Sequence, residues 1–178
     1  MITKNFKALL AVILQSAGNT DTNGLLPIKS QTGTTIYLSF RQNGFPYSVY
    51  NSVSIASSAS NNGIRLGTGN TQATENDYNL ESRITSGLTA SSPAVTYDVD
   101  ENGNPYKEFL FTLTNTTNSD ITVAEIGYFQ QVYTSTSKGA NTSTTTIMLD
   151  RTVLSTPVTV PANDSAAIKY TLKTIMPS

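Results

Sequence analysis

Apolar and polar residues alternate with a period of two along most of the chain after residue 33. The clearest case lies near the end, where three apolar residues alternate with three polar ones: Ile168, Tyr170 and Leu172 against Lys169, Thr171 and Lys173. Residues 36–41 and 109–114 alternate in the same way, and residues 121–128 are rich in β-branched and aromatic types. Successive side chains of a strand point to opposite faces, so this pattern predicts half-buried strands of an antiparallel sheet.

Turn residues separate these runs. Asn-Gly pairs occur at 43–44, 62–63 and 102–103, and further turn signals occur at 138–139 and 161–164. Short strands joined by polar turns predict an all-β fold, an antiparallel β-sandwich of jelly-roll-like or immunoglobulin-like type. The Thr/Ser-rich stretch 134–146 is expected to be an exposed loop or a long hairpin tip.

The N-terminal segment has a different pattern. Lys4 and Lys7 precede the apolar run 8–14, as in a weak secretory signal, but that run is at the lower limit of length for a signal and too short to span a bilayer. A period of 3.6 instead predicts an amphipathic helix over roughly residues 4–15, with an apolar stripe made by Phe6, Leu9, Leu10 and Ile13. The stripe packs either on its own domain or on a neighbouring subunit. We expect residues 1–20 to form this helix or arm and residues 21–178 to form the sandwich.

The composition removes most routes to catalysis. The chain has no Cys and no His, so thiol nucleophiles, Ser-His-Asp triads and His-metal sites are excluded. Its formal net charge is −1 and only 13% of its residues are charged, which leaves no basic surface for gripping a phosphate backbone. We therefore expect no enzyme activity, no cofactor, and neither nucleic acid nor membrane as a partner.

One segment resembles the first half of a calcium loop. Asp98, Asp100, Asn102 and Gly103 have the right spacing, but the twelfth position is Phe109 and the flanking residues are strand-like rather than helical. A β-hairpin with Asn102-Gly103 at its tip is the favoured interpretation.

Other candidate sites are weaker. Gly67-Thr-Gly-Asn70 could cradle phosphate but lacks a following helix, so a turn after a short strand is expected. Glu125 is the one acid in an apolar strand, and we expect it to face the polar side or to pair with a base such as Arg151. Acid pairs such as Glu75 and Asp77 are expected to be ordinary exposed groups. The Asn-x-Ser/Thr sequons, at Asn115, Asn141 and Asn163, carry little weight in so Asn/Thr-rich a chain.

Several segments, taken in order, resemble a known pattern. Residues 64–71, which read Ile-Arg-Leu-Gly-Thr-Gly-Asn-Thr, lead into Asp77-Tyr-Asn-Leu80. A strand pair at 111–115 and 121–128 follows, and a closing hairpin at 148–172 contains Pro157-Val-Thr-Val160. Together these segments are similar to small structural proteins, of minor head, neck or tail type, in the virions of tailed bacteriophages. The resemblance covers roughly residues 60–173 and supplies no catalytic residue.

The resemblance implies a non-enzymatic virion protein that assembles with other virion proteins, and a homo-oligomer under virion symmetry. Within it, Tyr78 and Leu80 are expected to fill the core while Asp77 caps the local backbone.

Two alternatives come from other classes. A carbohydrate- or receptor-binding module of a phage fibre or an adhesin would use exposed tyrosines, for which the candidates are Tyr37, Tyr47, Tyr50, Tyr128 and Tyr133. A polysaccharide hydrolase would need a pair of carboxylates, for which Glu125 and Asp150 are the candidates.

Overall fold

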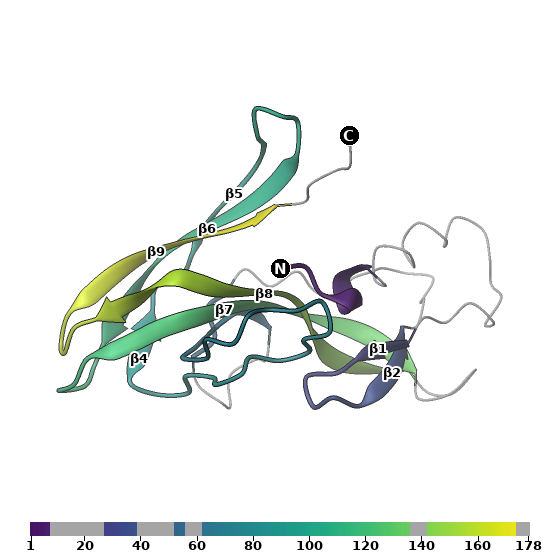
Figure 1. Cartoon of the computed structure of the whole chain (residues 1–178), viewed down its shortest axis with the longest axis horizontal. Coiled ribbons are helices and arrows are strands. Elements are labelled where there is room, and N and C mark those ends of the chain that lie inside the picture. Colours follow the sequence, from purple (N-terminus) through teal and green to yellow (C-terminus); the bar gives the residue numbers. More distant parts are fainter. Residues whose placement is uncertain (8–26, 39–51, 56–61, 136–141, 174–178) are drawn as a thin grey trace.

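The computed structural model describes residues 1–7, 27–38, 52–55, 62–135 and 142–173. In this part of the chain two antiparallel sheets face each other, so the predicted all-β sandwich is confirmed (Figure 1). Sheet A contains β1 (Pro27–Lys29), β2 (Thr35–Leu38), β3 (Gly63–Gly67), β7 (Ile121–Ser135) and β8 (Thr142–Val160). Sheet B contains β4 (Leu88–Ala90), β5 (Ala94–Val99), β6 (Pro105–Asn115) and β9 (Ser165–Lys173).

Each sheet is organised around one long central strand. In sheet A, β8 runs along one edge of β7, and β2 and β3 pair with successive parts of the other edge. In sheet B, β9 runs along one edge of β6, and β4 and β5 share the other. The pairing Ser135↔Thr142 shows that the predicted low-complexity loop belongs to a long β7–β8 hairpin.

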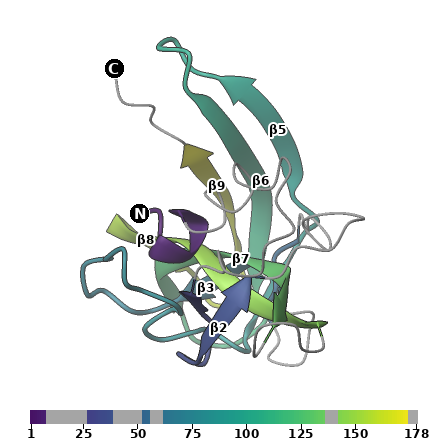
Figure 2. The ribbon, with the colours of Figure 1, turned by 90° about the vertical axis from the view of Figure 1, so that its right-hand side faces the viewer.

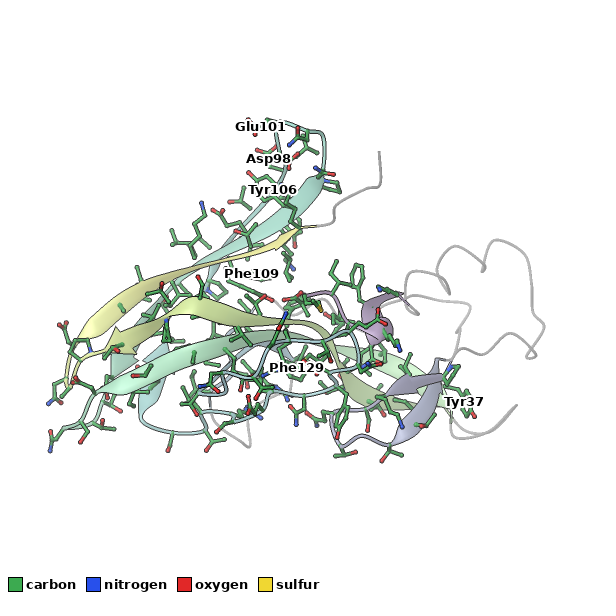
Figure 3. The ribbon with its side chains drawn as sticks, viewed as in Figure 1. Tyr37, Asp98, Glu101, Tyr106, Phe109 and Phe129 are labelled. Atoms are coloured by element: carbon green, nitrogen blue, oxygen red, sulfur yellow. The ribbon has the colours of Figure 1, made fainter. Side chains whose placement is uncertain are left out.

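The core lies between the sheets and follows the alternation in the sequence. Phe109, Phe111 and Leu113 of β6 are buried on the inner face, and Ile168 and Tyr170 of β9 lie beside them. The Phe109 ring centroid is 5.6 Å from that of Tyr128 on sheet A and 6.2 Å from that of Tyr170. Figure 3 shows Phe109 between the two sheets. Burial of large side chains of this kind supplies most of the stabilisation of such a sandwich.

A β-bulge in β8 changes which residues face the core. Tyr128 pairs with Asp150 but Phe129 pairs with Met148, so Leu149 is the additional residue on β8. Leu149 belongs to the buried cluster between the sheets, and Asp150, opposite the inward-facing Tyr128, lies on the same face. A bulge of this type re-aims side chains, and here it directs a carboxylate into an otherwise apolar region.

The two sheets diverge at one end of the sandwich. There the β5–β6 hairpin extends away from sheet A as an arm, and its tip lies far from the strands of sheet A (Figure 1). Asp98, Glu101 and Tyr106 lie in this outer part of the hairpin (Figure 3). The inner face of the arm is therefore a continuation of the core face with no strand of sheet A opposite it.

The first seven residues pack on their own sandwich. Ile2 forms an antiparallel bridge with Asp150, and the Thr3 amide donates to the Leu149 carbonyl at 3.1 Å. Residues 4–7 form one helical turn, and Phe6 packs against the core cluster. Phe6 thus contacts its own sandwich, and contact of the stripe with a neighbouring subunit stays a prediction. Leu9, Leu10 and Ile13, and with them the rest of the predicted helix, lie outside the described residues.

Candidate functional site

The outer face of sheet A is covered by the connection between β3 and β4, which we call the covering segment (residues 68–84). Leu80 of this segment, together with Phe129 and Met148, forms a second buried cluster on the face of sheet A away from sheet B. Backbone amides of Glu81 and Ser82 donate to Glu125 of β7 at 3.1 and 2.8 Å. The segment therefore covers sheet A with both apolar and polar contacts.

Glu125 is the centre of the polar contacts. Its carboxylate is fully buried and accepts hydrogen bonds from the Gly69 amide at 3.2 Å and from Arg151 Nε at 2.8 Å, besides the two amides of residues 81 and 82. A buried carboxylate is tolerated only when it is paired and hydrogen-bonded, and here four donors meet both conditions. The predicted pairing with Arg151 is confirmed.

Arg151 extends the network to the covering segment. Its Nη1 donates to Asp77 at 2.8 Å and its Nη2 to Glu81 at 3.3 Å, while the guanidinium is itself buried. Burial opposes the charge on Arg151, but hydrogen bonds to Asp77 and Glu125 outweigh it and raise the pKa of Arg151. We call Asp77, Glu81, Glu125 and Arg151 the clasp, because one guanidinium joins sheet A to two carboxylates of the covering segment.

Asp77 has the predicted capping role. It accepts hydrogen bonds from the amide and the hydroxyl of Thr74 at 2.9 and 2.8 Å. Partial burial acts in the opposite direction, but the bonds from Thr74 and Arg151 hold the pKa of Asp77 below its usual value. The prediction for Leu80 is also confirmed, because its side chain is buried.

The prediction for Tyr78 is wrong. Its side chain is 42% exposed and its ring lies against Gly33, in the turn between β1 and β2, rather than in the core. In an irregular segment the backbone does not alternate, so a spacing of two from Leu80 does not place Tyr78 on the same side.

The Gly-Thr-Gly motif makes room for the clasp. Gly67 is the last residue of β3, and residues 68–70 continue as irregular backbone rather than as the expected turn, with the Thr68 amide donating to the Ser82 carbonyl. Gly69 approaches Glu81 and Glu125 so closely that a Cβ there would lie 2.5 Å from Glu81 Cβ and 2.7 Å from Glu125 Oε1. A side chain at this position would push the covering segment away from sheet A. The glycine serves packing, and its amide is already bonded to Glu125.

The two carboxylates considered for hydrolysis lie on opposite faces of sheet A. Glu125 and Arg151 face the covering segment, whereas Asp150 faces sheet B and accepts from the Tyr170 hydroxyl at 2.6 Å and the Thr152 hydroxyl at 3.0 Å. Burial, together with the nearby Asp150 charge, raises the pKa of Tyr170. A sheet separates the two acids, so they cannot act on one glycosidic bond.

The diverging ends of the sheets enclose a cleft of about 710 Å³. Its walls come from sheet B, from β7 and β8, and from the N-terminal segment. They combine aromatic and aliphatic residues with charged groups, which are Lys107, Lys173, Asp150 and the Met1 amino terminus that pairs with Asp150 at 3.1 Å. Apolar walls with a few convergent polar groups are typical of ligand sites and of protein interfaces.

Lys107 is the half-buried cation of the cleft. Its Nζ lies 4.7 Å from the ring centroid of Phe109 and 5.2 Å from those of Tyr97 and Tyr128. It also donates to the Tyr128 hydroxyl at 3.3 Å. Burial lowers the pKa of Lys107, and burial with the charge of Tyr97 raises the pKa of Tyr128 to about 12. The cation is thus surrounded by ring faces, a favourable setting for its charge.

The calcium-like segment is a hairpin turn, as favoured. The Asp100 carboxylate accepts from the amides of Asn102 and Asn104, both at 2.8 Å, and contacts Lys173. These bonds, led by that of Lys173, hold the pKa of Asp100 well below its usual range. Its oxygens are therefore already engaged within the turn. In the described part of the chain no group of three or more acidic side chains is arranged to hold a metal ion.

The remaining sequence candidates lie apart from both regions. The Asn115 side chain is buried and donates to the Val160 carbonyl at 3.0 Å, while Asn163 is exposed in the β8–β9 turn. Tyr37 lies on β2, away from the cleft (Figure 3). Three of the predicted candidates, Asn141, Tyr47 and Tyr50, lie outside the described residues, as does the side chain of Tyr133.

Sequence reasoning missed the cleft and most of its residues. Of the two proposed tyrosines whose side chains the structure describes, Tyr37 and Tyr128, only Tyr128 lies there, and neither Tyr97 nor Lys107 was singled out. A signal was present: Val95, Tyr97 and Val99 alternate with Thr96 and Asp98, so β5 has an apolar face. The sequence does not show that this face extends beyond sheet A.

No family model, no curated protein and no solved structure matches this chain. Among the described residues there is no helix with the length and apolar character needed to cross a membrane.

Proposed function

We propose that this chain is a non-enzymatic structural protein of a tailed-bacteriophage virion, associated with its head, neck or tail, that assembles with neighbouring virion subunits. The observation that carries the proposal is the uncovered inner face of the β5–β6 arm. Tyr97 is 64% exposed and Val99 58% exposed, on the face that elsewhere forms the core. Large apolar side chains gathered on one exposed surface mark an interaction site.

The positions of the resembling motifs support a structural role. Thr68 and Gly69 of the Gly-Thr-Gly motif and the run Asp77-Tyr-Asn-Leu80 belong to the covering segment, and Glu125 and Arg151 belong to the clasp that holds it. Each of these contacts stabilises the fold and presents no reactive group to solvent. A protein that has to keep one surface rigid for its neighbours needs such fixed connections.

The first test is the protein content of particles. Virions purified from the source that encodes this chain should contain it in a fixed ratio to the main capsid protein, measured by quantitative mass spectrometry. A non-structural protein from the same genome is the control for carry-over. Absence of the chain from intact particles, with the protein abundant in the lysate, would overturn the proposal.

The cleft favours one alternative, a carbohydrate-binding module. Tyr97 and Phe6 supply ring faces for stacking against a sugar, and Lys107 supplies a hydrogen-bonding group beside them. A glycan array decides this alternative. Binding to a defined glycan that is lost in Tyr97→Ala would support it, and an array without hits would remove it.

A further inference from the structure

We propose that β5 pairs antiparallel with β5 of a second copy of this chain, about a two-fold axis that passes beside Tyr97. This inference rests on the proposed function in taking the exposed face of the arm as an assembly surface, and it adds the partner and the register. It would join two copies of sheet B into one continuous sheet.

Strand β5 is the terminal strand of its sheet, with β6 on one side and no described strand on the other. Figure 2 shows β5 at the outer edge of sheet B. An unprotected edge of this kind presents a row of backbone donors and acceptors to another chain.

The hydrogen-bonding pattern between β5 and β6 decides which residues of β5 carry the free backbone donors and acceptors. The Asp100 amide donates to the Asn104 carbonyl, so the pair 100–104 is hydrogen-bonded. In an antiparallel ladder hydrogen-bonded and non-hydrogen-bonded pairs alternate, so the even-numbered residues of β5 bond to β6. The amides and carbonyls of Val95, Tyr97 and Val99 therefore point outward at the free edge.

The outward-facing residues of β5 also carry its apolar side chains. On the inner face of the arm, Val95 lies opposite Phe109, Tyr97 opposite Lys107 and Val99 opposite Pro105. Strands commonly protect an edge with inward-pointing charges, but β5 has no charged residue on this face. Backbone groups and apolar side chains are thus available together at Val95 and Tyr97. At Val99 the carbonyl is the available group, because the amide donates to the Asp98 carboxylate at 2.8 Å.

The order of residues along β5 favours one register for its pairing with β5 of the second copy. With Tyr97 opposite Tyr97 of the second copy, Val95 lies opposite Val99 and Thr96 lies opposite Asp98. All three outward-facing residues then take part in hydrogen-bonded pairs, with apolar residues facing apolar ones. The acidic tip, Asp100 and Glu101, comes to lie opposite the uncharged residues 94 and 93.

The neighbouring registers are less favourable. A shift of two residues in one direction places Asp98 opposite Asp98 of the second copy, where like charges repel. The same shift in the other direction places Val99 opposite Pro93, which has no amide hydrogen to donate. The strand is therefore complementary to itself in the register centred on Tyr97, which is why a second copy fits better than an unrelated strand.

The test uses cross-linking in a chain that has no cysteine of its own. The full-length Tyr97→Cys variant should form a disulfide-linked dimer under mild oxidation. Val95→Cys and Val99→Cys should each cross-link poorly alone and efficiently when mixed, because these positions face each other only across the axis. Equal cross-linking of the single variants and of their mixture would overturn the register.

A second variant removes the edge without disturbing the sheet. Tyr97→Pro removes an outward-facing amide together with the mostly exposed ring, and neither group bonds to β6. The bonds between β5 and β6 should remain, and the melting temperature should stay close to that of the wild type. Sedimentation should show concentration-dependent dimers for the wild type and for the Tyr97→Phe control, and monomers for Tyr97→Pro. A wild-type monomer at every concentration, or a Tyr97→Pro dimer, would refute the pairing.

The two proposals fail in different ways. Particles that contain the chain while the wild type stays monomeric in solution would refute the β5 pairing and leave the virion assignment intact. A Tyr97-centred dimer that is absent from particles would refute the virion assignment and support the pairing.

Discussion

The outer face of sheet A and the inner face of the β5–β6 arm are both strand surfaces with large apolar side chains and without a sheet packed against them, yet only the first is covered. On sheet A the covering segment buries Phe129 beneath Leu80 and is fixed by the clasp. On the arm, Tyr97 and Val99 stay exposed. One surface is thus covered by a buried charge network while the other stays open, and this difference is the basis for proposing the second as an assembly surface.

The largest effect should come from breaking the clasp. Arg151→Met removes the cation but leaves Glu125 fully buried, and an uncompensated buried charge costs about 3–5 kcal/mol. The free energy of unfolding, measured by chemical denaturation, should fall by this amount. Lys169→Met is the matched control: it breaks a pair with Glu108 of 2.7 Å, and the loss should be small because Lys169 is exposed and water screens its charge. Similar losses in the two variants would show that the clasp does not hold the covering segment.

The next prediction compares the two surfaces directly. Leu80→Ala removes a buried side chain from above Phe129 and Met148, and such a cavity costs about 2–5 kcal/mol. Tyr97→Ala removes a mostly exposed ring and should change the free energy of unfolding by only about 0.5 kcal/mol. If Tyr97→Ala were as destabilising as Leu80→Ala, the arm would belong to the core and the difference between the surfaces would disappear.

The sequence predicted the parts of this comparison that depend on regular alternation. Phe109, Phe111 and Ile168 lie on the core face because strands alternate, and Glu125 was predicted to pair with Arg151 because an acid inside an apolar strand needs a partner. Tyr78 was misplaced because no period governs an irregular segment.

The cleft could not be predicted for a different physical reason. It exists because the β5–β6 hairpin extends beyond sheet A, and because a bulge at Leu149 turns Asp150 toward sheet B. Both features depend on how strands far apart in the sequence are placed against each other, which a local pattern does not encode.

The clasp should also give the protein a measurable acid sensitivity. The folded-state pKa of Asp77 is lowered, so its contribution to stability is present above the unfolded pKa of about 4 and is lost as pH falls through the folded value. The free energy of unfolding should therefore decrease on acidification below about pH 4, and less steeply in Asp77→Asn. Identical slopes for the wild type and this variant would show that Asp77 is not coupled to Arg151.

The smallest effect is expected at Lys107, and it sharpens the comparison between two cations that are both withdrawn from water. Arg151 meets three carboxylates, whereas Lys107 lies among the rings of Phe109, Tyr97 and Tyr128. A cation above ring faces is stabilised by about 0.5–2 kcal/mol. For Lys107 the cost of desolvation, which also lowers its pKa, largely offsets this stabilisation. Lys107→Met keeps the packing of the stem against the rings and removes only the charge.

The free energy of unfolding of Lys107→Met should therefore lie within about 1 kcal/mol of the wild type, with the melting temperature as a second readout. A loss as large as that of Arg151→Met would mean that Lys107 stabilises the arm as the clasp stabilises the covering segment, and that both surfaces are closed by the same means.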